Sequence, residues 1–395
     1  MQKEYFLLII TNLLQKFILL FILSLLAKNI PTSLFGEFRY NITLSTLLFL
    51  PLMGITSSLI NNLSKYNNID NKKIIVFNSL FLLLTLFALE IFIIGKFLNY
   101  NHILLLYMFS TCIDAFYIAF LSGIQSIKKL SFYRVLQTIF QLLAIYILIS
   151  TNKLNYFNLS FFYNFASFFV FIFFEIISRE LYLSFKFSKK IINKLIIFSI
   201  SATIGSISYN LLLYINSIYI NKYLSSSHYA QYSAAEMIAT VFSILPLALS
   251  SFITSKMTKA ENSSLKCEIL FKNIKLYIVI SFFLFIFMFI TNKYFINLIY
   301  GVQYSYSSKL VIPICISTFF ISLHTYFAQY FFSIFKPIIP AISLTVSCIL
   351  SVIISKIFII KFQLVGAAYS NIISTFFCFL LILYFFNKNR VEKQF

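Results

Sequence analysis

The chain has 395 residues, of which 60% are hydrophobic, 19% are aromatic and only 11% are charged, and its mean hydropathy is +0.91. Soluble domains carry about 25% charged residues, so this composition excludes a soluble protein and indicates an integral membrane protein. The net charge of +20 does not indicate a nucleic-acid partner, because Lys and Arg lie in short patches between apolar runs. We interpret these patches as topology signals that face anionic lipid headgroups.

A membrane-spanning helix needs about 20 apolar residues, and the apolar windows of this sequence predict twelve such helices. The polar or charged connections between them are too short for a separate soluble domain. In chain order the predicted spans cover residues 5–27, 40–62, 74–95, 103–124, 132–150, 157–177, 195–220, 232–255, 275–291, 310–333, 337–360 and 364–386.

The distribution of basic residues predicts the orientation of these helices. Alternate connections, counted from the N-terminus, contain 21 Lys and Arg residues, whereas the connections on the opposite side contain nine. Because cytoplasmic connections carry the excess of Lys and Arg, we expect both termini in the cytoplasm. A missed or additional span would disrupt this alternation, so the count also favours an even number of spans.

Two similar segments half a chain apart indicate an internal duplication. The segment Phe35–Phe38 precedes Pro51, and the segment Tyr229–Tyr232 precedes Pro246 at a similar spacing. The offset between the copies is about 194 residues, which corresponds to six predicted helices. Because six is an even number, the two copies have the same orientation in the membrane.

The duplication predicts an all-α fold with two parallel-repeat lobes of six transmembrane helices each, arranged around a central polar cavity. We expect the N-terminal lobe over residues 1–180 and a basic cytoplasmic linker over residues 181–194. The C-terminal lobe, with a short cytoplasmic tail, is expected over residues 195–395.

Ionisable side chains near the bilayer centre cost about 2.5–3.5 kcal/mol each on insertion, so those that are present are candidates for function. Lys16, Asp114 and Glu236 are among the deepest in the predicted spans. Lys16 shares a helix face with Asn12 and Gln15, and Asp114 is its expected partner. If the two pair, sequence alone does not separate a structural role from a role in transport.

The seventh and eighth predicted spans carry polar stripes at helical spacing. Asn210 belongs to the first stripe, and Glu236 and Thr240 belong to the second. One explanation is hydrogen bonding between helices, which contributes only about 0.6 kcal/mol per pair in membranes. A hydrated cavity between the lobes is the favoured explanation, because two adjacent spans each carry five or six polar residues.

Shorter polar stripes occur on the fifth and tenth predicted spans. The fifth carries Arg134, Gln137 and Gln141, and His324 adjoins the stripe on the tenth. A lone histidine in a membrane is expected to be a hydrogen-bonded packing residue rather than a proton carrier. The three histidines are far apart and no glycine-rich phosphate loop occurs, so we expect no metal site, no cofactor and no ATPase motor.

Four short motifs, in a consistent order along the chain, resemble those of polysaccharide exporters of the MOP superfamily, which includes the MATE transporters. The motifs are PTSLFGEFRY at Pro31–Tyr40, YAQYSAAE at Tyr229–Glu236, YGVQY at Tyr300–Tyr304 and LVGAAY at Leu364–Tyr369. In its length, its two predicted lobes and its short connections, the chain is most similar to the O-antigen flippases of that superfamily.

This resemblance implies a flippase, not an enzyme, in the bacterial inner membrane. It would move an undecaprenyl-pyrophosphate-linked oligosaccharide from the cytoplasmic to the periplasmic leaflet by alternating access. The implied partners are the lipid-linked oligosaccharide, membrane lipids and glycan polymerase machinery, and the coupling ion stays open. Lys16 and Arg39 are the cationic groups suited to attract pyrophosphate or acidic sugars.

Two alternatives stay open at this point. The first is a cation-coupled small-molecule antiporter of the same fold, in which Asp114 or Glu236 is the coupling carboxylate. The second is a membrane enzyme of envelope glycan synthesis, such as a polymerase or acyltransferase, with His324 as a catalytic residue.

Overall fold

The computed structural model describes residues 2–65, 68–97, 102–178, 184–260, 262–334 and 336–391. Within these ranges the chain forms thirteen α-helices and one short 3-10 helix, and it contains no β-strand. The all-α class predicted from the sequence is therefore confirmed. Residues 181–183 of the expected linker and residues 392–395 of the expected tail lie outside the described residues.

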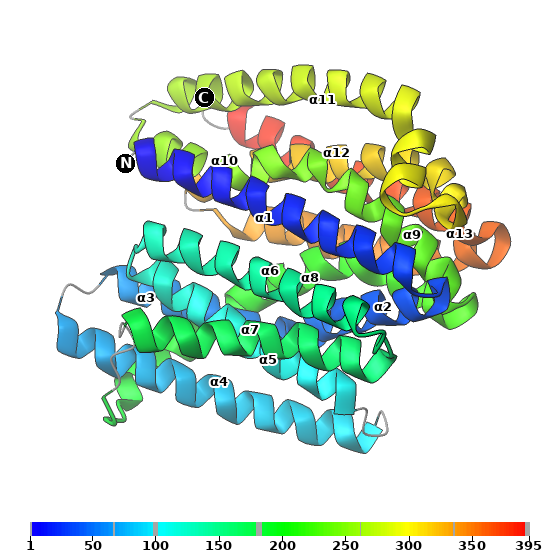
Figure 1. Cartoon of the computed structure of the whole chain (residues 1–395). Coiled ribbons are helices and arrows are strands. Elements are labelled where there is room, and N and C mark those ends of the chain that lie inside the picture. The colour runs from blue at the N-terminus through cyan, green and yellow to red at the C-terminus, as the bar shows by residue number, and fades with distance from the viewer. Residues whose placement is uncertain are drawn as a thin grey trace. The chain divides into compact units, whose positions relative to one another are not determined.

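The helices follow one another with short connections (Figure 1). Their bounds are α1 (Gln2–Asn29), α2 (Thr32–Leu48), α3 (Leu50–Lys65), α4 (Ile69–Phe97), α5 (His102–Gly123), α6 (Ile127–Ser150), α7 (Tyr156–Ser178), α8 (Lys189–Tyr223), α9 (Ser226–Ala239), α10 (Val241–Lys259), α11 (Ser263–Ile299), the 3-10 helix η1 (Val302–Ser307), α12 (Ser308–Ser333) and α13 (Ile338–Val391).

Eight helices in the described part of the chain are long and apolar enough to cross a membrane. A ninth span results if the bent pair α2 and α3 is counted as one. Helix α13 has 54 residues and is interrupted at Gln363, and at about 1.5 Å per residue each of its two parts is long enough to cross a bilayer core of roughly 30 Å. The predicted total of twelve stays a prediction, because α8, α9 and α10 are not among these candidates.

The chain divides into two compact units. Unit 1 comprises Met1–Asn29 and Asn41–Ile207, and unit 2 comprises Ile30–Tyr40 and Ser208–Phe395. These units differ from the lobes expected over residues 1–180 and 195–395 in two segments. The first part of α2 belongs to unit 2, and the first part of α8 belongs to unit 1, so two six-helix lobes stay a prediction.

Unit 1 is built around α5, which packs against α3, α4, α6 and α7. Figure 1 shows α4, α5, α6 and α7 side by side, and α1 lies along α6. The first part of α8 belongs to this unit because it packs closely against α3. A Cβ atom at Gly54 of α3 would collide with the backbone of Ser199, and the Thr203 hydroxyl donates a hydrogen bond of 3.4 Å to the Pro51 carbonyl. Part of the predicted polar stripe on α8 therefore serves helix packing.

Unit 2 is built around α12, which packs against α9, α10, α11 and α13. The first part of α2 joins this unit through aromatic and backbone contacts. The Phe35 ring packs edge-on against Tyr300 and Tyr304, at centroid distances of 6.4 Å and 5.6 Å. A Cβ atom at Gly36 would collide with the Ser226 carbonyl, so glycine is what allows α2 to approach the start of α9.

Both copies of the expected duplication contain a broken helix. Helices α2 and α3 meet at 60° beside Pro51. Helix α9 ends at Ala239, and α10 begins at Val241 and contains Pro246. A proline inside a helix removes a backbone hydrogen bond and clashes with the preceding turn. The sequence predicts continuous spans over residues 40–62 and 232–255, so both breaks differ from the prediction: one directly precedes Pro51, and the other lies at Thr240, before the turn that contains Pro246.

Connections that are expected on the same side of the membrane lie together within unit 2. His228, Tyr306 and Gln363 line one pocket, although they come from the start of α9, from η1 and from the interruption in α13. Lys336, between α12 and α13, donates a hydrogen bond of 2.9 Å to Asn389 near the end of α13. If successive spans alternate in direction, every second connection lies on the same side of the membrane, as these two groups of connections do. Which group faces the cytoplasm stays a prediction.

Candidate functional site

Four residues that the sequence singled out line one cavity inside unit 1. The cavity has a volume of about 220 Å³, and Gln15 reaches it from α1, Asp114 from α5, and Gln137 and Gln141 from α6. Hydroxyl, phenol and amide side chains supply most of the remaining lining. They are Ser45, Tyr107, Ser110, Thr111, Thr138, Tyr163, Asn164 and Ser167.

The two glutamines of this cavity are held by the same serine. Gln137 and Gln141 each donate a hydrogen bond to the Ser167 hydroxyl, at 3.2 Å and 2.9 Å. Both side chains are buried, and buried amides need such partners. The stripe predicted on the fifth span therefore faces α7 and helps to hold α6 against it.

Asp114 has a partner that the sequence pattern did not indicate. The Tyr133 hydroxyl donates a hydrogen bond of 2.8 Å to an Asp114 carboxylate oxygen. Arg134 is near enough for its charge to act on Asp114, and its guanidinium also donates a hydrogen bond of 3.0 Å to Asn12. The Lys16 side chain is exposed, and its expected pairing with Asp114 stays a prediction.

Asp114 also lines a second cavity of about 300 Å³ in unit 1, together with Thr111. Thr56 and Ser57 of α3 and Ser206 of α8 supply hydroxyl groups to this second cavity. Asp114 and Thr111 therefore line both cavities, the second of which is lined mainly by apolar side chains. A carboxylate in this position could interact with a cation or a proton that moves between them.

The second group of sequence-predicted residues lies in unit 2, where α2 meets α9. The Arg39 guanidinium donates a hydrogen bond of 2.7 Å to the Ser233 hydroxyl. Glu236 lies one helical turn further along α9, and the charge of Arg39 acts on it. Thr240 stands at the break between α9 and α10, where its hydroxyl donates to the Met237 carbonyl at 2.6 Å.

Arg39 and Ser233 are 194 residues apart, which is the offset of the expected duplication. Under the expected duplication these two residues are matched with each other, and they are in direct contact. Gly36 and Ala230 are related in the same way, and a Cβ atom at Gly36 would lie 3.3 Å from the Ala230 nitrogen. A crossing of two helices at residues that the expected duplication matches is the arrangement expected near a two-fold axis, and the duplication itself stays a prediction.

Two tyrosines complete the surroundings of Arg39. The hydroxyl groups of Tyr300 and Tyr304 are buried, and neither has a hydrogen-bond partner in the described part of the structure. The charge of Arg39 acts on Tyr300. Sequence reasoning quoted both residues only within a family-like motif, because a Tyr in an apolar span does not reveal whether its hydroxyl is satisfied. Buried hydroxyls without a partner are uncommon and are therefore candidates for ligand contacts.

The remaining candidates lie outside these two groups. Asn210 is half-buried on α8 in unit 2. His324 is only 2% exposed, and its Nε2 atom lies 2.8 Å from the Ser343 hydroxyl, which agrees with a packing role. Within the residues that the structure describes, no group of three or more His, Cys, Asp or Glu is arranged to hold a metal ion.

Comparison with protein families decides what kind of chain carries these sites. A family model described as polysaccharide biosynthesis protein matches residues 1–251, which is more than half of the chain. The chain belongs to this family. The matched part includes Arg39, Asp114 and Glu236, so both groups of candidate residues lie wholly or partly within it.

Solved structures share the fold over nearly the whole chain. An inward-facing multidrug resistance MATE family transporter of the MOP superfamily is 14% identical, with a TM-score of 0.75 over 100% of this chain and 95% of that chain. The lipid II flippase MurJ in an inward closed conformation is 16% identical, with a TM-score of 0.79 over 97% of this chain and 87% of that chain. A MOP superfamily transporter from Pyrococcus furiosus is 13% identical, with a TM-score of 0.63 over 96% and 94% of the two chains.

A comparison with curated proteins finds no match. At these low identities the solved structures show the fold alone. The resemblance to polysaccharide exporters of the MOP superfamily is confirmed, and this member of the polysaccharide biosynthesis protein family is a multi-pass membrane protein with the fold of MOP transporters.

Proposed function

We propose that this protein is a flippase for an undecaprenyl-pyrophosphate-linked oligosaccharide, such as the repeat unit of an O-antigen or a related surface polysaccharide. It acts in the bacterial inner membrane, with both termini in the cytoplasm, and exposes its substrate to the two sides of the membrane in turn. The observation that carries this proposal is membership of the polysaccharide biosynthesis protein family. The fold shared with MOP transporters, one of which is a lipid II flippase, supports it.

Arg39 is the residue that we assign to the pyrophosphate group. A guanidinium is always charged and offers several N–H donors that match phosphate oxygens. In this structure Arg39 donates to Ser233, and its charge acts on Tyr300. The buried hydroxyls of Tyr300 and of its neighbour Tyr304 have no hydrogen-bond partner among the described residues and are further donors. When α2 and α9 separate, these groups become available to an anionic ligand, and Glu236 limits how tightly that ligand is held.

The lipid tail and the sugar place different demands on the protein. The polyisoprenyl chain can stay in the bilayer, because its transfer into the protein would gain little. The sugar and the pyrophosphate need a polar path across a core of roughly 30 Å. We assign this path to the central cavity expected between the lobes, with Asn210, Glu236 and Thr240 on its wall. Glycan polymerase machinery is the proposed acceptor of the translocated unit.

Deletion of the gene tests this function. A flippase acts after the lipid-linked unit is assembled and before it is polymerised, so we expect complete units to accumulate on undecaprenyl pyrophosphate. These units should be shielded from a glycan-binding probe added to the periplasm. Normal surface polysaccharide in a deletion strain that has no second flippase would overturn the proposal.

A cation-coupled small-molecule antiporter is the second candidate. The position of Asp114 on the lining of two cavities of unit 1 favours it, because a carboxylate there can exchange a cation for a substrate. The same deletion strain separates the two functions. Loss of an antiporter would change sensitivity to toxic compounds and leave the lipid-linked intermediates and the surface glycan at normal levels.

A further inference from the structure

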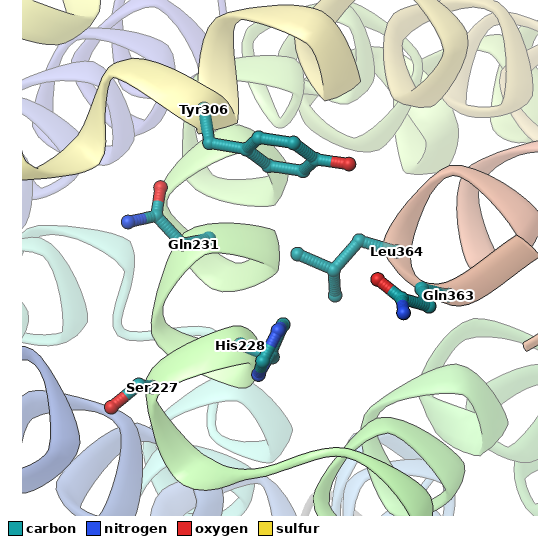
Figure 2. Close-up of a pocket in the computed structure, with 6 residues that line it drawn as sticks. All are labelled: Ser227, His228, Gln231, Tyr306, Gln363 and Leu364. Atoms are coloured by element: carbon teal, nitrogen blue, oxygen red, sulfur yellow. The ribbon is translucent and has the colours of Figure 1, made fainter.

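A pocket of about 300 Å³ lies within unit 2. Six residues from three separate elements line it: Ser227, His228 and Gln231 of α9, Tyr306 of η1, and Gln363 and Leu364 of α13. Figure 2 shows Tyr306, His228, Gln363 and Leu364 around one space, whereas the Ser227 side chain turns away from it. A volume of about 300 Å³ is at the lower end of the range for small-molecule sites.

Two of the polar side chains are fixed by hydrogen bonds outside the pocket. His228 Nδ1 lies 2.7 Å from the hydroxyl of Ser225, the N-cap residue of α9, and this contact sets the orientation of the ring. Gln231 donates to the Gln303 carbonyl at 2.6 Å and accepts from the Ser307 hydroxyl at 2.7 Å. These contacts tie α9 to η1, so the pocket wall is held in place before any ligand binds.

The third wall contains the main backbone irregularity of unit 2. Gln363 has a φ of 53° and a ψ of −135°, which interrupts α13 and is a conformation that favours glycine. A Cβ atom at Gly366 would collide with the Phe358 carbonyl, so the two parts of α13 approach each other closely at this bend. A glutamine at a position that favours glycine costs about 1–3 kcal/mol, and such strain is concentrated at functional sites.

The chemistry of the pocket is suited to a sugar ring. Tyr306 and Leu364 offer an aromatic face and an apolar side chain for the C–H face of a ring, and the ring of Tyr306 is itself ordered by Lys309, whose Nζ lies 5.2 Å from its centroid. The Tyr306 hydroxyl, the His228 imidazole and the Gln363 amide can donate to or accept from sugar hydroxyls. Among the described lining residues there is no carboxylate that would favour a metal ion and no Lys or Arg that would favour a phosphate.

We propose that this pocket binds one neutral pyranose unit of the transported glycan. The class of ligand rests on the proposed function, whereas the site itself rests on the geometry of unit 2. By the count of basic residues, the connections around the pocket lie on the periplasmic side. The pocket would therefore hold the sugar after it has crossed the membrane, at a site that is separate from Arg39.

The test uses the absence of tryptophan from the chain. A Tyr306→Trp variant of the full chain, purified in detergent, keeps an aromatic side chain in the wall and contains a single fluorescent indole there. The neutral probes are glucose, galactose and N-acetylglucosamine, and glucuronate is the charged comparison, each added to about 50 mM. We expect at least one of these neutral sugars to change the emission in a saturable way, and sorbitol to cause no saturable change.

Two further variants make the result specific. Gln363→Gly in the Tyr306→Trp background should fold well, because glycine accepts the positive φ, but it removes the amide and should weaken binding by about three- to tenfold. Tyr294→Trp places the indole on α11 at a side chain that is 79% exposed, and it should show no saturable response.

The proposal is overturned if no neutral sugar gives a saturable change, or if the Tyr294→Trp control or sorbitol gives the same change. Unchanged affinity in Gln363→Gly, or tighter binding of glucuronate than of every neutral sugar, would also overturn it. The deletion experiment is independent of this result. If the deletion strain loses surface glycan but the Tyr306→Trp variant binds no sugar, the proposed function stands and the pocket proposal fails. If the variant binds a sugar but the deletion strain keeps normal surface glycan, the pocket proposal stands and the proposed function fails.

Discussion

The polar sites of the two units differ in how far their side chains satisfy one another. In unit 1, Gln137 and Gln141 both donate to Ser167, and Asp114 accepts from Tyr133. In unit 2, Arg39 donates to a neutral serine, and the buried hydroxyls of Tyr300 and Tyr304 have no partner within the described ranges of the chain. A satisfied network holds helices together, whereas charged and unsatisfied donors are prepared for a ligand that arrives from outside. This contrast assigns substrate binding to unit 2 first.

The largest expected effect is that of replacing Arg39. Hydrogen bonds to charged groups contribute about 1.5–3 kcal/mol, so Arg39→Gln should lower glycan export by about ten- to 100-fold. Arg39→Lys keeps the charge but loses the planar arrangement of donors, and it should retain an intermediate rate. The measurement is the rate at which surface polysaccharide reappears after induction, normalised to the amount of protein in the membrane. Export at the normal rate in Arg39→Gln would contradict the assignment.

The second prediction compares the packing of the two units at their glycines. A Cβ atom collides with backbone at both Gly36 in unit 2 and Gly54 in unit 1, whereas the space around Gly205 is open. Gly36→Ala and Gly54→Ala should each destabilise the protein by about 1–3 kcal/mol through overpacking. Gly205→Ala is the matched control and should be neutral or slightly stabilising. Thermal unfolding in detergent measures the stability of all three variants. Equal melting temperatures for the three variants would contradict the close helix packing at Gly36 and Gly54.

The third prediction asks whether the unit 1 network is mainly structural. Asp114→Asn keeps an acceptor for Tyr133 but leaves the charge of Arg134 without its balancing carboxylate. We expect each of Asp114→Asn and Arg134→Gln to cost about 1–2 kcal/mol of stability, and the double variant to cost less than their sum. A double-mutant cycle on thermal stability measures this coupling. Strictly additive losses would mean that the two charges do not interact.

The smallest effect is expected at His324. Its ring is buried beside the Ser343 hydroxyl, so His324→Gln can keep one hydrogen bond and should change export by less than about twofold. The control is Ser343→Ala, which should be equally mild. Complete loss of glycan production in His324→Gln at normal protein levels would instead support the membrane-enzyme alternative.

The helical class and most helix positions were predictable from the sequence, because apolar windows of about 20 residues have few other solutions in a bilayer. The breaks before Pro51 and at Thr240 were not predicted, because the apolar windows over residues 40–62 and 232–255 continue across them. The identity of the partners was not predictable either. The hydrogen bonds of Tyr133 to Asp114 and of Arg39 to Ser233 depend on how two helices cross. Periodicity along one helix does not specify that crossing.

Two features of unit 2 had no sequence signal. The conformation of Gln363 occurs in an apolar stretch without glycine or proline at that position, so the pattern predicted only a short connection. The grouping of the first part of α2 with unit 2 and of the first part of α8 with unit 1 also had no signal, because it depends on close approaches at Gly36 and Gly54. A glycine in a span indicates a close approach but does not name the helix that approaches.

Translocation in a defined membrane tests the central claim most directly. The purified protein is reconstituted into vesicles that contain undecaprenyl-pyrophosphate-linked oligosaccharide, and the fraction of sugar accessible to an external glycosidase is followed in time. We predict that the normal protein makes the inner-leaflet sugar accessible, that Arg39→Gln does so about ten- to 100-fold more slowly, and that Gly205→Ala behaves like the normal protein. If accessibility stays at the level of protein-free vesicles while the reconstituted protein is folded and correctly inserted, the flippase function assigned here is contradicted.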